Sequence, residues 1–265
     1  MKKTVKKRRS YVRRKRGGTG IAILGVLLAV ALFVTVFLLA KIRTVELEGD
    51  CRYTLEELVA ECEGLGVGEG ILTVNEKAVR KALIEKFPYI EEVKVKRNYA
   101  RLSVTLEITE SKEAVSFKTE SGFIILDKNG KVLAIKESKP NLPELIGAGI
   151  TEFEEGKTAV FKDDTAHRIY KALWEEILNA ELADKINEIN ISKRYNITFD
   201  YMAKIIINLG NADNIAKKIT AAQICIKDNE SDEGKAEIKF QDDTAKTTIY
   251  HPLTDEEWID IKLNG

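Results

Sequence analysis

The 265-residue sequence has few of the side chains on which catalysis and metal binding usually depend. It contains only two histidines and three cysteines, and no C-x-x-C or paired Cys/His spacing. Zinc ligation and histidine-based acid/base chemistry therefore have few residues to use. The nucleophile motifs of serine and cysteine hydrolases are missing, and paired acids such as Glu175 and Glu176 fall on polar helix faces or in turns. We expect no catalytic residues, no cofactor and no metal site.

Phosphate-binding motifs are missing as well. Gly64, Gly66, Gly68 and Gly70 have the spacing G-x-G-x-G-x-G, without a buried strand before them and without the lysine and hydroxyl pair of a P-loop. We interpret this segment as a turn between two helices, because glycine readily adopts positive backbone angles.

The few cysteines and histidines have simple structural interpretations. Three cysteines cannot all pair within one chain, although Cys51 and Cys62 could form a disulfide outside the membrane. His167, close to Asp163 and Asp164, is interpreted as a surface or helix-capping residue.

Acidic residues are absent from the first twenty positions, which carry ten Lys or Arg. Residues 21–40, IAILGVLLAVALFVTVFLLA, contain no charge and would cover about 30 Å of hydrocarbon as a helix. The run is longer than a signal-peptide core, so we expect a retained membrane span, with a cleaved signal peptide as the alternative. The positive-inside rule places residues 1–20 in the cytoplasm and residues 42–265 outside. The basic tail suits anionic headgroups, and nothing beyond its charge indicates nucleic-acid binding.

The apolar pattern of residues 42–110 predicts a small domain with the order strand, helix, helix, strand, strand. Alternation indicates strands at 44–48, 93–96 and 102–109. Thr54 with Glu57 forms a capping box for the first helix, Asn75 can cap the second, and Pro88 ends it. Two amphipathic helices can then cover one face of a three-stranded sheet.

Residues 111–252 predict a second domain of mixed strands and helices. Short strands surround the Asn129-Gly130 turn, residues 139–147 form an ordered loop, and residues 163–179 form an amphipathic helix opened by Asp163 or Asp164. Three strands, a second helix over 211–227 and two final strands at 235–240 and 247–252 follow. Residues 253–265 are expected to be a short, exposed acidic tail.

Residues 42–115 resemble a POTRA domain, the polypeptide-transport-associated fold. The resemblance rests on the first strand, the glycine turn before GILTVN, the helix exit FPYIEEVKVKR and the closing LSVTLEITE. With the basic tail, the single span and the second domain, nearly the whole chain resembles the FtsQ/DivIB cell-division family. The fold class is then α+β, comprising a transmembrane helix, a β-α-α-β-β POTRA domain and a mixed domain with a mainly antiparallel sheet.

The resemblance implies a non-catalytic scaffold of the division septum that binds FtsB/DivIC-like and FtsL-like single-pass proteins and helps localise or regulate septal peptidoglycan synthesis. The final two strands could leave a sheet edge that pairs with an extended partner segment. Our candidate contact residues are Ile238, Phe240, Thr248 and Tyr250, although alternation alone also fits ordinary core positions. A membrane-anchored cell-wall hydrolase and a ligand-binding sensor remain as alternatives.

Overall fold

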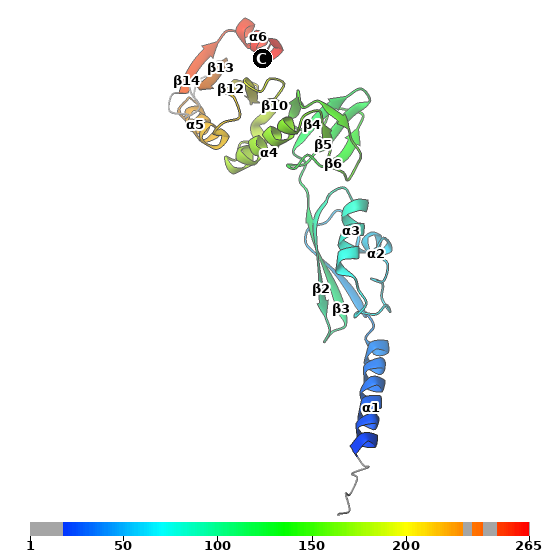
Figure 1. Ribbon diagram of the computed structural model, residues 1–265. Coiled ribbons are helices and arrows are strands. Elements are labelled where there is room, and N and C mark those ends of the chain that lie inside the picture. The colour runs from blue at the N-terminus through cyan, green and yellow to red at the C-terminus, as the bar shows by residue number, and fades with distance from the viewer. Residues whose placement is uncertain (1–17, 230–234, 241–247, 265) are drawn as a thin grey trace, which may run out of the picture.

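The computed structural model describes residues 18–229, 235–240 and 248–264, so residues 1–17 of the predicted basic tail lie outside the described part. Helix α1 (Gly18–Leu39) stands apart from the rest of the chain (Figure 1). No other element of the described chain packs against its segment Ala22–Leu39, which is 0% buried. A helix of 22 residues is about 33 Å long. The helix α1 is therefore long and apolar enough to cross a bilayer.

The first domain follows α1 directly and has the predicted order of elements. Its sheet has the order β1-β3-β2, with β3 parallel to β1 and antiparallel to β2. The two helices cover one face of this sheet, as Figure 1 shows. The elements are β1 (Thr44–Glu48), α2 (Leu55–Ala60), α3 (Glu76–Lys86), β2 (Ile90–Asn98) and β3 (Ser103–Glu110).

Local sequence signals determine where these helices begin and end. Thr54 and Glu57 form the predicted capping box of α2. Asn75 accepts a hydrogen bond from the Ala78 N–H at 3.2 Å and so caps α3, which ends two residues before Pro88. The core between helices and sheet contains Leu58, Leu65, Ile71, Val79, Leu83, Val93, Val104 and Leu106.

The second domain is built on a nine-stranded sheet with the order β14-β13-β12-β11-β10-β7-β4-β5-β6. Five of its eight strand pairings are antiparallel, which confirms the mainly antiparallel sheet. Strands β8 and β9 form a separate antiparallel pair. The strands are β4 (Val115–Thr119), β5 (Gly122–Leu126), β6 (Val132–Lys136), β7 (Glu144–Ile146), β8 (Ile150–Glu152), β9 (Val160–Phe161), β10 (Ile186–Asn190), β11 (Ile197–Tyr201), β12 (Ile205–Gly210), β13 (Lys235–Phe240) and β14 (Thr248–Leu253).

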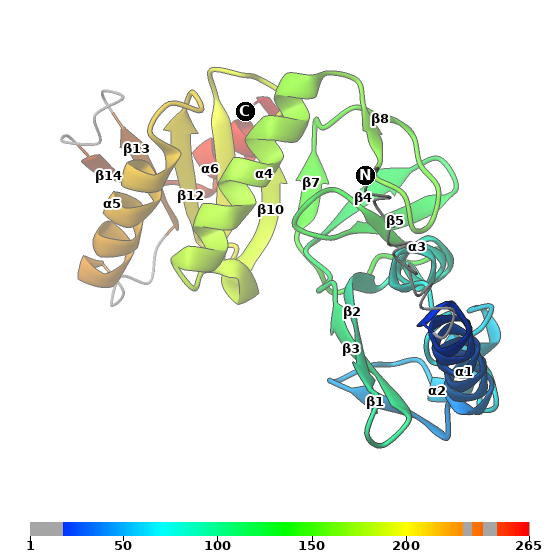
Figure 2. The same ribbon diagram turned by 60° about the horizontal axis from the view of Figure 1, so that its bottom comes forward.

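Helices cover both faces of one half of this sheet. α4 (Asp164–Asn179) and α5 (Ile215–Asp228) lie in front of the strands in Figure 2, and α6 (Asp255–Asn264) lies behind them. Asp163 caps α4, as predicted, by accepting a hydrogen bond from the Thr165 N–H at 2.7 Å. The apolar faces of α4 and α5 pack on Phe199, Ile207 and other inward residues of the sheet.

Short contacts join the two domains. The Lys131 ammonium donates to the Ile90 carbonyl at 2.9 Å, and the Lys128 ammonium lies 2.9 Å from the Glu91 carboxylate. Tyr89 packs with Ile125 and Leu133 in a small apolar cluster. The end of the first domain is therefore attached to the turn between β5 and β6 by both polar and apolar contacts.

Two expectations about secondary structure are wrong. The predicted loop 139–147 contains strand β7, which pairs with β4 and β10 and connects the two halves of the nine-stranded sheet. The predicted exposed tail 253–265 contains α6, whose Trp258 side chain is buried. β7 is only three residues long, and α6 has little apolar periodicity, so neither has a strong sequence pattern.

The cysteines and His167 also differ from the simplest expectations. Cys51 and Cys62 are separate thiols, and Cys62 is buried in the core of the first domain. His167 is half-buried, stacks on Phe161 with 4.6 Å between ring centroids, and donates from Nε2 to the Asn129 carbonyl at 2.8 Å. His167 therefore supports the turn that precedes β6 and is more than a surface residue.

Candidate protein-interaction site

The two outer strands of the nine-stranded sheet have different surroundings. At β6, the Val132 N–H donates to the Lys157 carbonyl at 2.9 Å, and the Gly156 N–H donates to the Val132 carbonyl at 2.8 Å. The Ile135 N–H donates to Glu155 Oε1 at 3.0 Å. Residues 155–157 therefore cover the backbone of β6, a common way of protecting a sheet edge.

β14 forms the other edge, and in the described part of the chain its one strand neighbour is β13. Ala236 of β13 is opposite Pro252, and its N–H donates to the Lys204 carbonyl on the β12 side at 3.0 Å. Since Pro252 has no N–H, these two residues form a non-hydrogen-bonded pair. Pairs alternate along an antiparallel ladder, so Thr248, Tyr250 and Pro252 direct their backbone groups away from β13.

The four predicted contact residues lie together but differ in exposure. Ile238 is opposite Tyr250, and Phe240 is opposite Thr248. Ile238 and Phe240 are buried in the core of the second domain, so their side chains are not at the surface. Thr248 and Tyr250 are half-buried on the edge strand, and Tyr250 packs against the same core. A role in partner binding stays a prediction for all four residues.

Helix α6, which lies in the segment predicted to be an exposed tail, holds β14 in place. Thr254 and Glu257 form a capping box directly after β14, with the Thr254 N–H donating to Glu257 Oε2 at 2.7 Å. Lys235 of β13 binds Asp255 at 2.7 Å and lies 5.4 Å from the ring centroid of the buried Trp258. The Thr-x-x-Glu pattern at 254–257 was the sequence signal for this helix.

The far end of α6 is attached to the sheet by charge. The Lys262 ammonium lies 2.7 Å from Asp200 Oδ2 and 3.3 Å from Glu188 Oε2. Burial favours a lower pKa for Lys262, but the hydrogen bond to Asp200 and the charges of both acids outweigh it and raise the pKa. Asp200 is 3% exposed, and its Oδ1 has no hydrogen-bond partner among the described residues. This ion pair is thus a partly buried attachment point for α6.

A large cleft lies where the two domains meet. Its volume is about 1290 Å³, and it is lined by the ends of β2 and β3, the segment after β3, the loop before β7 and the end of α4. Glu181 and Asp184 contribute exposed acids, and Leu178 contributes an exposed apolar side chain. A cleft of this size can receive an extended segment or a small molecule.

Residues suited to catalysis or metal binding are scattered. Across 18–229, 235–240 and 248–264, no group of three or more His, Cys, Asp or Glu side chains is arranged to hold a metal ion. His251 is exposed on β14, far along the chain from the half-buried His167.

Comparisons with known proteins cover both domains. The family described as POTRA domain, FtsQ-type matches residues 40–111, and Cell division protein FtsQ/DivIB, C-terminal matches residues 116–239. The cell division protein FtsQ of Corynebacterium glutamicum is 27% identical over 207 residues, which are 78% of this chain and 85% of that protein. The structure of the major extracytoplasmic domain of the trans isomer of DivIB from Geobacillus stearothermophilus aligns with a TM-score of 0.30 and 14% identity, over 47% of this chain and 99% of that one. With family matches along both domains in the expected order, the chain belongs to the FtsQ/DivIB family of cell-division proteins.

Proposed function

We propose that this chain is a non-catalytic, membrane-anchored scaffold of the division septum. It binds FtsB/DivIC-like and FtsL-like single-pass proteins and helps to localise or regulate septal peptidoglycan synthesis. The proposal keeps the expected cytoplasmic tail (1–20), span (21–40), POTRA domain (42–110) and second domain (111–252). The predicted tail 253–265 is joined to the second domain, because α6 packs on its sheet. Membership of a cell-division family and the apolar helix α1 support this assignment.

The observation that carries the proposal is the edge strand β14. An extended partner segment can add to such an edge through backbone hydrogen bonds, and side-chain pockets then give selectivity. Thr248 directs its backbone groups outward, and Pro252 limits the ladder because it cannot donate. A partner strand would therefore pair next to residues 248–251 and end beside Pro252.

A proline substitution tests this mode of binding. Thr248→Pro removes an outward N–H at the start of β14, where proline is compatible with an edge strand. We expect Thr248→Pro to weaken binding of an FtsB/DivIC-like protein to the full chain in detergent or nanodiscs, because one partner hydrogen bond is lost. Thr248→Ala loses the same side chain but keeps the N–H, so it should bind more tightly than Thr248→Pro. Equal affinity of all three proteins, with unchanged thermal unfolding, would contradict the edge-strand mode.

The cellular part of the proposal is tested by location. A fluorescent fusion should gather at mid-cell and lose this position when the partner is depleted or when Thr248→Pro is introduced. Uniform membrane fluorescence in dividing cells would contradict a septal scaffold.

The cleft between the two domains favours one second candidate function, a ligand-binding sensor. A rise in the unfolding temperature with cell-wall fragments, abolished by Leu178→Asp, would support the sensor instead.

A further inference from the structure

The connection between α1 and the first domain is short, and backbone hydrogen bonds attach it to the domain on two sides. Only residues 40–43 separate Leu39 from Thr44. The Ile71 N–H donates to the Ala40 carbonyl at 2.9 Å, and the Ile42 N–H donates to the Glu69 carbonyl at 2.7 Å. On the other side, the Arg43 N–H donates to the Leu102 carbonyl at 2.8 Å.

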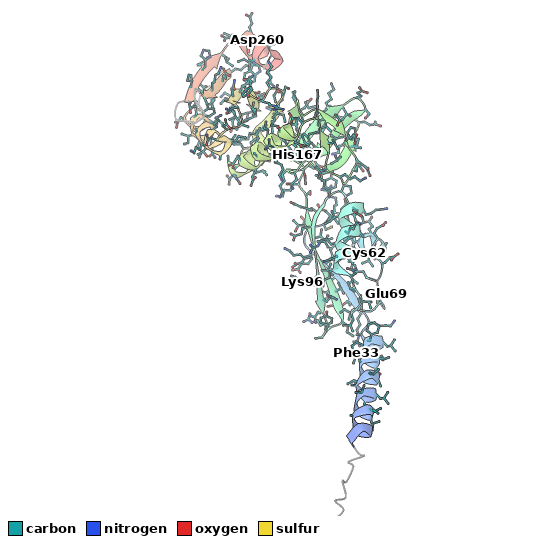
Figure 3. All side chains as sticks on the ribbon, viewed as in Figure 1. Phe33, Cys62, Glu69, Lys96, His167 and Asp260 are labelled. Carbon is teal, nitrogen blue, oxygen red and sulfur yellow. The ribbon has the colours of Figure 1, made fainter. Side chains whose placement is uncertain are left out.

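Two loops are therefore fixed at the level where α1 ends. They are the glycine loop, residues 66–72, and the turn between β2 and β3, residues 99–102. Figure 3 shows Phe33 near the end of α1 and Glu69 just beyond it, at the adjoining end of the domain. The glycine loop is bound further by the Lys41 ammonium, which donates to the Gly68 carbonyl at 2.9 Å.

The position of the loops relative to a bilayer follows from the sequence of α1. The uncharged run ends at Ala40, and Lys41 is the first charged residue after it. The headgroup layer on each side of a bilayer is about 5–8 Å thick. If α1 spans the hydrocarbon, residues 41–43 lie in this layer, and the loops bonded to residues 40–43 lie at the same depth.

Exposed apolar side chains in the first domain gather on these two loops. Between residues 42 and 110, the exposed large apolar side chains are Val67 at 71%, Tyr99 at 55% and Leu72 at 41%. Val67 and Leu72 lie on or at the end of the glycine loop, and Tyr99 lies at the tip of the turn. Tyrosine is enriched at membrane interfaces, where its ring and hydroxyl contact different layers.

Charged side chains at this end are mainly basic. Lys41, Arg43 and Arg101 are exposed there, and Glu69 is the acid among the exposed residues of the same segments. Lys and Arg side chains near an anionic bilayer surface are attracted to it. This end of the domain combines apolar and basic groups, as expected for contact with lipid headgroups.

We propose that the glycine loop and the β2–β3 turn rest in the headgroup layer of the membrane that α1 crosses. Val67, Leu72 and Tyr99 contact the boundary of the acyl chains, and Arg43 and Arg101 bind lipid phosphates. The first domain would then be held at a fixed orientation on the bilayer, and it would not swing on a flexible stalk. This inference depends on membrane anchoring by α1 but on no protein partner.

Tryptophan quenching in nanodiscs tests the contact with the full-length chain. Val67→Trp and Tyr99→Trp should lose emission when phosphatidylcholine carries brominated acyl chains. Tyr195→Trp is the matched control, because Tyr195 is 84% exposed but lies between β10 and β11 in the second domain. The parent protein supplies the background from Trp174 and Trp258, both buried.

A fourth variant separates failure of the inference from failure of the anchor. Leu28→Trp lies within α1 and is quenched if α1 crosses the disc. The headgroup contact would be overturned if Leu28→Trp is quenched while the two loop variants are not. In that outcome, Val67→Trp and Tyr99→Trp would emit as strongly as Tyr195→Trp. Unquenched Leu28→Trp would overturn the anchor itself, and the inference with it.

The phosphate contacts need a second comparison. Adding anionic phosphatidylglycerol to the discs should increase quenching of Val67→Trp when Arg43 and Arg101 are intact. Arg43→Glu with Arg101→Glu should remove this dependence, while circular dichroism stays unchanged. Equal quenching with and without phosphatidylglycerol in the protein with native arginines would overturn the assigned phosphate contacts.

Discussion

The buried Tyr170 hydroxyl donates a hydrogen bond to the Asp127 backbone carbonyl over 2.6 Å, linking α4 to the turn between β5 and β6. The Asp127 side chain accepts two backbone hydrogen bonds at 2.8 Å, from Asn129 and Lys131, and one at 3.2 Å from the Ser111 hydroxyl. Asp127 therefore organises the turn and binds the segment that leaves the first domain.

Removing the Asp127 carboxylate should destabilise the second domain. Asp127→Ala would leave the Asn129 N–H, the Lys131 N–H and the Ser111 hydroxyl without their acceptor, and we expect a loss of about 3 kcal/mol in the free energy of unfolding. Urea denaturation of the full chain in detergent checks this value. Asp127 and the exposed Asp184 both line the cleft between the two domains, so Asp184→Ala is the control and should change stability little. Equal stability of the two variants would contradict the role of Asp127.

Gly147 and Gly64 allow steric overlap to be separated from backbone strain. Both have a φ of +76°, but a Cβ on Gly147 would overlap the backbone of Ser192, whereas a Cβ on Gly64 would meet nothing within 4 Å. Gly147→Ala should therefore cost about 2–4 kcal/mol, and Gly64→Ala about 1 kcal/mol. Thermal unfolding of both variants measures the difference. A loss at Gly64 as large as that at Gly147 would mean that backbone strain alone accounts for the effect.

The sequence predicts the first domain well because its signals are local. Thr54, Asn75 and Pro88 mark helix ends. The alternation around Val93 and Val104 correctly predicts which face of each strand is buried. These preferences agree with the tertiary structure, so local patterns suffice. Resemblance to the FtsQ/DivIB family adds the order of the domains.

The rest of the fold depends on contacts between distant residues. Strand β7 exists because Glu144–Ile146 fits between β4 and β10, and three residues carry no periodicity of their own. Alternation in β13 and β14 shows two faces but does not show which is covered, so Ile238 and Phe240 could equally be core or contact residues before the position of α5 is known. The position of β14 at the edge of the described sheet likewise depends on the order of the strands.

Because the ion pair between Lys262 and Asp200 attaches α6 to the sheet, the effects of these two residues on the free energy of unfolding should be coupled. Lys262→Met leaves Asp200 as a buried carboxylate without its cation, and we expect a loss of about 2 kcal/mol, less than for a fully buried pair because Lys262 is partly exposed. Adding Asp200→Asn should restore part of this loss, since an amide is less costly to bury than an unpaired charge. Chemical denaturation of the two single variants and the double variant gives the coupling energy. Strict additivity would show that the ion pair does not fix α6.

The Cys62 thiol should be protected from alkylation in the folded protein. Burial, with a smaller contribution from Glu61, raises the pKa of Cys62 to about 11. The thiolate is the reactive form, so Cys62 should react with iodoacetamide at pH 8 much more slowly in the folded protein than in urea. Mass spectrometry of peptides measures labelling at each cysteine. Rapid labelling of Cys62 in the folded protein, or recovery of a Cys51–Cys62 disulfide peptide, would contradict the buried thiol.

Tyr89 predicts how stability changes at alkaline pH. It lies at the domain junction, where its hydroxyl donates to Glu113 at 2.7 Å and the Arg52 guanidinium stacks 3.3 Å above its ring. Burial, followed by the hydrogen bond to Glu113, raises the pKa of Tyr89 from 10.0 to about 12. The neutral phenol is thus favoured in the folded protein more than in the unfolded chain.

Linkage determines the direction of the effect. Below pH 10 both states hold the phenol proton, and the stabilisation is complete; between pH 10 and about pH 12 the unfolded chain loses the proton first, so the folded state loses stability as the pH rises. Tyr89→Phe cannot ionise and lacks this loss. We therefore expect the stability advantage of the parent over Tyr89→Phe to shrink between pH 9 and pH 12, as measured by urea denaturation. Other lysines and tyrosines titrate in both proteins and cancel in the comparison, so a constant difference across this range would show that Tyr89 ionises equally in the two states.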